Sequence, residues 1–416
     1  MERRRAVVTG LGVLTSIGIG VDDFWNGLQQ GRNGVGLITR FDTTNFDTKF
    51  AAEVKNFNSD NYMDRKAAKR MDLFTQYAMA TSEMAMNDSR LNLDKIDKEK
   101  FGVIFGSGIG GMTTLEQQHW IYFESKTPRK LSPFFVTMMI SDIAAGQISI
   151  RFGLKGPNYA TTSACATSSH AIADAYMLIQ RGSADIMICG GSEASITEMA
   201  IGGFNAMRAL STWNDRYLEA CRPFDKDRSG FVMGEGAGTI VLEEYQHAIN
   251  RGAKIYAEVG GIGLTADAFH ITAPAPNGEG AYRSMKEAMR DAGVIPEDVD
   301  HINAHGTSTP YNDVNETNAI KSAFGEHAYE MVINSTKSMT GHLLGAAGGV
   351  EAVATILSLV NNKVPPTINL TNPDPECDLN YSANKLTEKK INSAISNTFG
   401  FGGHNASILF KKLRNE

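Results

Sequence analysis

Cysteine is scarce in this chain, and the few cysteines present follow no recognisable pattern. They stand at positions 165, 189, 221 and 377, with no C-x-x-C pair among them. This spacing argues against a disulfide framework and against a thiolate zinc site. We therefore expect a protein of a reducing, cytoplasmic compartment.

Long apolar runs and an excess of positive charge are also missing. The best apolar run, residues 343–360, contains Glu351, so we expect neither a membrane-spanning helix nor a membrane partner. Four glycines interrupt the apolar N-terminal stretch, which favours a buried strand at residues 6–9 over a signal peptide. The 40 basic and 46 acidic residues give a net charge of -6, which argues against a nucleic-acid partner.

What the chain does have is length and an alternating pattern. Its 416 residues exceed the roughly 250 to 300 at which one hydrophobic core stops growing, so two core-forming halves are expected. Short β-branched runs alternate with longer alanine- and methionine-rich segments of helical period, which predicts an α/β fold. The predicted strands include residues 5–9, 103–105, 186–189, 255–259 and 391–396.

One local pattern, a strand followed by a tight turn and a small-residue helix, occurs twice. Residues 159–163 lead through Ala164-Cys165 into a predicted helix at 166–181 and a strand at 185–189. Residues 331–335 lead through Thr336-Lys337 into a predicted helix at 339–359 and a strand at 394–397. We therefore predict an internal duplication, with an N-terminal half of residues 1–252 and a C-terminal half of residues 253–416.

Cys165 lies where a predicted strand gives way to a helix. A thiol at a helix N-terminus faces unpaired N–H groups, which stabilise the thiolate and lower the thiol pKa below its usual value of ~8.5. Cys165 is therefore the candidate nucleophile. A buried thiol that only packs is the alternative, and it is the interpretation we keep for the other three cysteines.

Two of the nine histidines lie in polar, glycine-containing runs. His305 stands in the loop N-A-H-G-T-S-T-P, where the hydroxyls of Thr307 and Thr309 are spaced to bond an extended ligand. His342 follows Lys337 by five residues and is expected at the start of the second small-residue helix. If a pseudo-twofold axis relates the halves, Cys165, both histidines and Lys337 converge at one place.

Metal and dinucleotide sites are not supported by the sequence. The H-x-x-x-H spacing of His301 and His305 falls on a predicted strand and loop, and no third ligand accompanies it. The run that begins at Gly10 has Thr15 where the dinucleotide fingerprint needs glycine. The glycine-rich run at 106–111 lacks an acidic residue at the spacing expected for a ribose contact. We expect no catalytic metal and no redox cofactor.

At these residues the chain resembles the β-ketoacyl-acyl carrier protein synthases of the thiolase superfamily, most closely the type II members of fatty-acid synthesis. The resemblance runs from residue 4 to the C-terminal end and includes P-F-D at 223–225, G-E-G-A-G at 234–238, P-P-T-I-N at 365–369 and residues 399–405. His342 selects the elongating branch, since the type III branches have asparagine there. Ser163 and His404 are small departures, because relatives often carry threonine at both positions.

The resemblance implies a thiolase-like fold, in which two similar βαβαβαββ halves pack as α-β-α-β-α layers. It implies an acyltransferase that carries out a decarboxylative Claisen condensation of malonyl-carrier with an acyl primer held on Cys165. It also implies a homodimer that works with acyl carrier protein, which brings its own phosphopantetheine. A polyketide-type ketosynthase has the same catalytic residues and stays open as the alternative.

The resemblance also implies roles for individual residues. His305 and His342 stabilise the enolate, while Lys337 fixes His342 and the local field. Glu316 is expected to balance the charge of Lys337, and Phe401 to gate the site. Thr307 and Thr309 are expected to bind pantetheine. The acyl pocket is expected to be lined by Ile109, Phe134, Phe204 and Leu344.

Two further sets of residues carry over from the family. One is a structural monovalent cation site at Asn303, Glu351, Ser396 and Asn397. The other is a carrier-protein dock, for which a predicted helix at 65–70 places four cations within six residues. The dock residues are Arg65, Lys66, Lys69, Arg70 and Arg208. The segment at 131–135 is expected to be shared with a second subunit.

Overall fold

The computed structural model describes residues 3–413, which fold into two similar halves. One 11-stranded sheet runs through both halves and joins them where residues 6–8 pair with residues 257–259. The five main strands of each half are called its N-terminal or C-terminal sheet. The N-terminal half has the strand order β1-β8-β7-β5-β6, and the C-terminal half has β9-β15-β14-β10-β11. Within each half the order is first, fifth, fourth, second, third along the chain. This shared order confirms that the two halves are similar.

The strands of the two sheets are mostly longer than the sequence predicted. The N-terminal sheet contains β1 (Ala6–Thr15), β5 (Phe101–Gly106), β6 (Asn158–Tyr159), β7 (Ile186–Glu193) and β8 (Gly236–Glu244). The C-terminal sheet contains β9 (Ala257–Ala266), β10 (His301–Asn303), β11 (Val332–Asn334), β14 (Ser393–Gly400) and β15 (His404–Lys411). The shorter strands are β2 (Gly18–Ile19), β3 (Gly36–Leu37), β4 (Phe50–Ala51), β12 (Lys363–Val364) and β13 (Thr387–Glu388).

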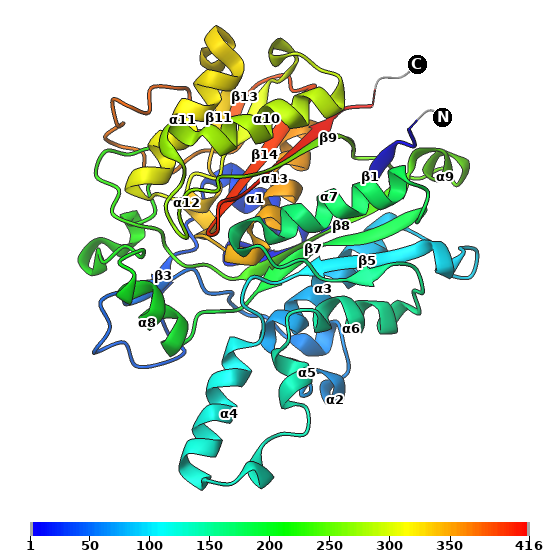
Figure 1. Cartoon of the computed structure of the whole chain (residues 1–416), viewed down its shortest axis with the longest axis vertical. Helices are drawn as coiled ribbons and strands as arrows, with labels where there is room; N and C mark the ends of the chain where they lie inside the picture. The colour runs from blue at the N-terminus through cyan, green and yellow to red at the C-terminus, as the bar shows by residue number, and fades with distance from the viewer. Residues whose placement is uncertain (1–2, 414–416) are drawn as a thin grey trace.

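Helices cover both faces of each sheet (Figure 1). α7 (Thr167–Gln180) and α13 (Ala347–Asn361) contact each other and strands of both sheets, and so form the middle layer. α3 (Leu73–Ser89) and α6 (Ile143–Phe152) pack on the N-terminal sheet, and α10 (Glu279–Ala292) packs on the C-terminal one, beside α11 (Pro310–Phe324). These layers are the predicted α-β-α-β-α arrangement. The remaining helices are α1 (Val21–Gln30), α2 (Arg65–Ala68), α4 (Met112–Ser125), α5 (Phe135–Met139), α8 (Glu198–Ala206), α9 (Tyr245–Asn250) and α12 (Lys337–Thr340).

The middle layer is made of small residues because two helices and two sheets meet there. Gly348 lies so close to α7 that a Cβ would stand 2.2 Å from the Ser169 hydroxyl. The stretch Leu344–Asn361 is long and apolar enough to cross a membrane, but 89% of it is buried inside the structure. A helix surrounded by protein on all sides has to be apolar all round, so this is a core helix.

The second small-residue helix is interrupted where the sequence predicted a continuous helix over 339–359. α12 stops at Gly341, whose φ of 69° ends the helix, and a 3-10 turn at Leu344–Ala346 precedes α13. His342 therefore lies between two helices rather than at a helix start. Its backbone forms an isolated β-bridge with Met233. The predicted boundary between the halves, at 252/253, falls in the connector between α9 and β9 and stays a prediction.

Candidate active site

Cys165 lies in a 3-10 turn, Ala164–Ala166, directly before α7. Ala164 has φ of 50°, a conformation that residues with a side chain seldom adopt. Gly400, at the end of β14, packs so closely that a Cβ there would stand 3.0 Å from the Cys165 backbone nitrogen. The turn is thus held between the two sheets, with the sulfur facing a pocket.

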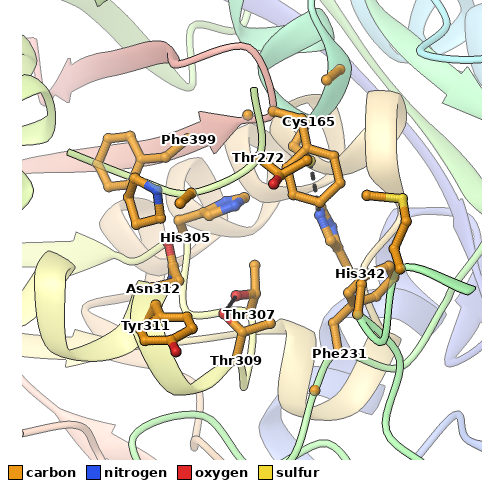
Figure 2. A pocket seen from close by; sticks show the side chains of 18 of the residues that line it. Cys165, Phe231, Thr272, His305, Thr307, Thr309, Tyr311, Asn312, His342 and Phe399 are labelled. Carbon is orange, nitrogen blue, oxygen red and sulfur yellow. Dashed lines mark hydrogen bonds between the residues drawn. The ribbon is translucent and has the colours of Figure 1, made fainter. Parts of the chain in front are cut away.

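The side chains of Cys165, His305 and His342 converge in this pocket (Figure 2). Nε2 of His342 lies 3.1 Å from the Cys165 sulfur. The two imidazole rings are 5.4 Å apart between centroids and nearly perpendicular, at 87°. Each half of the chain therefore supplies part of the site, Cys165 from one and the histidines from the other.

Burial keeps both imidazoles neutral. It lowers the pKa of His305 and of His342 well below the usual value, and the Lys337 ammonium lowers both further. A neutral imidazole offers one N–H donor and one acceptor. Nδ1 of each ring is buried without a hydrogen-bond partner among the described residues.

The pKa of the Cys165 thiol differs from the sequence expectation. Burial raises its pKa to about 11, although Lys337 and the backbone N–H groups of Phe401 and Cys165 act in the opposite direction. The prediction of a lowered pKa is therefore wrong for the resting site, because desolvation outweighs the helix N-terminus. The thiol must therefore lose its proton only as substrate arrives.

Lys337 is fully buried, and its partner is not the one expected. Its ammonium group hydrogen-bonds the carboxylate of Glu351, which projects from α13. Glu316, the predicted partner, instead accepts the backbone N–H groups of His305 and Gly306, both at 2.8 Å. Glu316 therefore holds the His305 loop from behind, on α11, and burial raises its pKa to about 7.

The expected cation site has a suitable set of oxygens. Oδ1 of Asn303, Oε2 of Glu351 and Oγ of Ser396 are all buried without a hydrogen-bond partner in the described structure. Asn303 and Ser396 are register partners on β10 and β14. Oxygen ligands suit a hard monovalent cation, so these three residues fit one. The side-chain oxygen of Asn397 already accepts the Ser407 hydroxyl at 2.7 Å, and the place of Asn397 in the cation site stays a prediction.

A divalent metal is a weaker interpretation of the pocket. The ligand atoms of Cys165, His305 and His342 lie within 4.8 Å of one another, and zinc uses such side chains. The buried Lys337 ammonium lowers the pKa of both histidines and would repel a dication in the same way. The arrangement is better suited to nucleophilic and acid-base chemistry.

Most of the predicted binding residues line this cavity of about 550 Å³. Predicted residues that line it are Ile109, Phe204, Arg208, Thr307, Thr309, Leu344 and Phe401. The hydroxyls of Thr307 and Thr309 are 2.9 Å apart. Phe231 and Phe399, which we did not single out, pack edge-on against His342 and His305. The only sequence signal for either was its place beside glycines.

Phe134 does not line this pocket, so the prediction is wrong for a single chain. It precedes α5 on the segment that projects from the molecule with α4 (Figure 1), and its ring lies 4.7 Å beneath the guanidinium of Arg70. A projecting segment cannot reach the interior of its own chain, which explains the difference.

The predicted dock is a set of exposed cations on two separate elements. Arg65 and Lys66 begin α2, which is four residues long and not the longer helix predicted, and Lys69 and Arg70 follow it. All four are exposed, and Asp64 caps the helix. Arg208 is also exposed and lies at the pocket.

Comparison with known proteins covers both halves. A model described as the N-terminal domain of beta-ketoacyl synthases matches residues 3–248, and one described as the C-terminal domain matches residues 256–371. The chain is 53% identical over 414 residues to 3-oxoacyl-[acyl-carrier-protein] synthase 2 of Synechocystis sp. (strain ATCC 27184 / PCC 6803 / Kazusa), which covers 100% of this chain and 99% of that protein.

Two solved structures extend the comparison. A beta-ketoacyl synthase from Burkholderia phymatum STM815 is 36% identical, with a TM-score of 0.92 over 99% of this chain and 100% of that one. A ketosynthase structure described as a type II PKS acyl-carrier protein in complex with its ketosynthase is 34% identical, with a TM-score of 0.91 and the same coverage. Matched models in both halves and a full-length relative at 53% identity show that this chain belongs to the beta-ketoacyl synthase family.

Proposed function

We propose that this chain lengthens acyl chains in fatty-acid synthesis as a 3-oxoacyl-[acyl-carrier-protein] synthase of type II. The observation that carries the proposal is the convergence of Cys165, His305 and His342 in one pocket. The full-length relative named as such a synthase supports it. A polyketide-type ketosynthase is less favoured, because the type II PKS structure is 34% identical and the curated relative 53%.

In the first stage, Cys165 takes an acyl group from a carrier-protein thioester. The sulfur attacks the carbonyl carbon as the thiol gives up its proton, and the pantetheine sulfur leaves with that proton as a thiol. The backbone N–H groups of Cys165 and Phe401, which already hydrogen-bond the sulfur, are suited to hold the oxyanion. Phe401 precedes Gly402 and Gly403, both at positive φ, so its loop can swing as a gate.

In the second and third stages, malonyl-carrier loses CO2 and its carbanion attacks the acyl-cysteine. The N–H donors of His305 and His342 stabilise the enolate oxygen, and the hydroxyls of Thr307 and Thr309 bind the pantetheine. The new carbon–carbon bond displaces the Cys165 thiolate, which leaves a 3-oxoacyl thioester two carbons longer. None of these steps transfers electrons to a cofactor, so we propose none; a monovalent cation at Asn303, Glu351 and Ser396 would be structural.

The test is a two-product assay of the purified protein with an acyl-carrier primer and radiolabelled malonyl-carrier. Labelled CO2 and a product two carbons longer by mass spectrometry are expected together. Release of the primer as a free acid without extension would instead indicate a thioester hydrolase.

We also propose a cytoplasmic homodimer. All four cysteines lie within the described residues as buried free thiols, which suits a reducing compartment. β6 is an open sheet edge, and the projecting α4–α5 segment exposes Trp120, Tyr122, Phe123 and Val136 (Figure 1). Sheet edges and apolar patches of this kind are usually covered by a partner.

Light scattering at micromolar concentration is therefore expected to give twice the chain mass of 45.1 kDa. Val136→Glu should weaken the dimer, because it places a charge where the apolar side chain is buried in the pair. A wild-type monomer at these concentrations would contradict the proposal.

For the carrier protein we propose docking on the exposed cations near the pocket. Lys69→Glu combined with Arg208→Glu is expected to raise KM for acyl-carrier substrates by about tenfold and to flatten its salt dependence, since these charges steer an acidic partner. Short pantetheine-thioester mimics should be affected much less.

The matched control for the dock is Lys286→Glu with Arg290→Glu, which makes the same change in net charge on exposed residues of α10. It should leave KM for the carrier substrate near the wild-type value. Equal losses on carrier and mimic in the dock variant would mean that Lys69 and Arg208 support the fold instead.

A further inference from the structure

Glu193, the last residue of β7, is a fully buried carboxylate that the proposed reaction does not use. It forms no ion pair within residues 3–413. Its two oxygens instead accept a set of hydrogen bonds between 2.9 and 3.3 Å. The donors are the hydroxyls of Ser107 and Ser195 and the backbone N–H groups of Gly108, Ile109 and Gly345.

These donors belong largely to two segments that form walls of the acyl pocket. Residues 107–109 follow β5, and Gly345 lies in the 3-10 turn before α13. Gly108, Ile109 and Leu344 line the pocket. One oxygen, Oε2, joins the two walls directly, because it accepts from Gly108 at 2.9 Å and from Gly345 at 3.0 Å.

The close approach of the two walls depends on both glycines. A Cβ at Gly108 or at Gly345 would stand 2.8 Å from Oε2 of Glu193, and one at Gly345 would stand 2.2 Å from the Gly108 nitrogen. Real side chains do not approach this closely. The walls therefore contact each other through backbone, with the Glu193 carboxylate as the group that fixes their spacing.

The internal duplication explains how the carboxylate comes to lie there. The turn at Leu344–Ala346 repeats the turn at Ala164–Ala166: each begins with a residue at positive φ, 48° and 50°, and each leads into a central helix. Gly345 is thus the counterpart of Cys165. β7 packs against the second turn as β14 packs against the first. The Glu193 carboxylate therefore lies beside the backbone N–H of Gly345, which has no side chain where Cys165 has its thiol.

A carboxylate is the one side chain that suits this place. It accepts at several lone pairs and donates nothing, whereas a glutamine amide would direct its own N–H groups at some of these donors. Burial raises the pKa of Glu193, while the backbone and serine hydrogen bonds oppose that rise. The site therefore holds a poorly solvated charge that only these donors compensate.

We propose that Glu193 is a positioning residue that sets the spacing of Ile109 and Leu344 and thereby determines which primer lengths the acyl pocket accepts. This inference rests on the proposed function, because it concerns the pocket of the same reaction. Ile109 and Leu344 contact the acyl chain, and Glu193 acts through them.

The first test is Glu193→Gln, assayed with hexanoyl- and dodecanoyl-carrier primers. The amide can keep its oxygen on Gly108 and Gly345, and both serines can rotate to accept, but the Ile109 N–H loses its acceptor. Loss of one hydrogen bond of this kind corresponds to about fivefold, so we expect the ratio of kcat/KM for the two primers to change by about five- to tenfold, mainly through KM. Glu193→Ala, which removes every acceptor, should change it more if it folds.

The control is Glu243→Gln, which alters a fully buried carboxylate at the opposite end of the same pair of strands. It is expected to lower the melting temperature without changing the primer ratio. An unchanged ratio in Glu193→Gln, or the same change in Glu243→Gln, would overturn the proposal. Wild-type protein that extends neither primer would instead refute the proposed function, so the two failures are distinguishable.

Discussion

Replacing Cys165 with alanine is expected to lower condensation by about 10⁴-fold or more while the protein still folds, because no other group can carry the acyl intermediate. The turn around it is built from alanines, and the sulfur makes one side-chain hydrogen bond, to His342. Decarboxylation of malonyl-carrier should fall much less, since it depends on His305 and His342. Chain extension and CO2 release are measured in parallel on the same samples.

Cys189→Ala is the matched control for this change. Cys189 lies in β7 as a fully buried thiol whose pKa burial raises well above the usual value, and it lines no part of the pocket. Its replacement should reduce stability modestly and leave condensation near the wild-type rate. Condensation by Cys165→Ala at that rate would remove Cys165 from the nucleophile role.

The sequence was sufficient to predict the duplicated fold and the residues that meet in the pocket. Cys165 could be found because it stands in a polar run of small residues at a predicted strand-to-helix boundary. His305 and His342 could be found because each stands in a polar, glycine-containing run. Once the two halves were recognised as similar, a pseudo-twofold arrangement brought both turns to the same place. In the structure the two turns, Ala164–Ala166 and Leu344–Ala346, contact each other.

The partner of Lys337 could not be predicted, because it depends on how a helix is broken. Had one helix run through Lys337 to Glu351, the two would lie about 21 Å apart along its axis. Gly341 ends α12 and the turn at Leu344–Ala346 redirects the chain, which brings the two side chains together. The spacing of apolar residues in a sequence indicates a helical period, but it does not indicate at which glycine the chain adopts a positive φ and ends the helix.

Burial is the other property that the sequence did not reveal. The pKa of Cys165 was expected to fall because a helix N-terminus can be read from the chain, whereas the desolvation that raises it depends on residues from both halves. Phe134 was placed in the pocket by resemblance alone, and its actual contact with Arg70 depends on the projection of the α4–α5 segment. Glu193 had no signal beyond following two glycines and a serine.

Removing one member of the buried Lys337–Glu351 pair is expected to have the largest effect on stability. Lys337→Met leaves the Glu351 carboxylate buried without its cation, and Glu351→Gln leaves the ammonium buried without its anion. Breaking a buried pair in this way typically lowers the free energy of unfolding by about 3–5 kcal/mol. Denaturant titration of each single variant measures the loss.

The double variant Lys337→Met with Glu351→Gln separates stability from catalysis. It removes both charges, so most of the stability should return, and the two single losses should not add. Activity should still be impaired, because the Lys337 ammonium is one of the causes that lower the pKa of His305 and His342. Without it both pKa values rise, the imidazoles become protonated at higher pH, and the acid limb of the pH–rate profile should move upward. A double variant with wild-type stability and an unshifted acid limb would show that Lys337 serves only as a partner for Glu351.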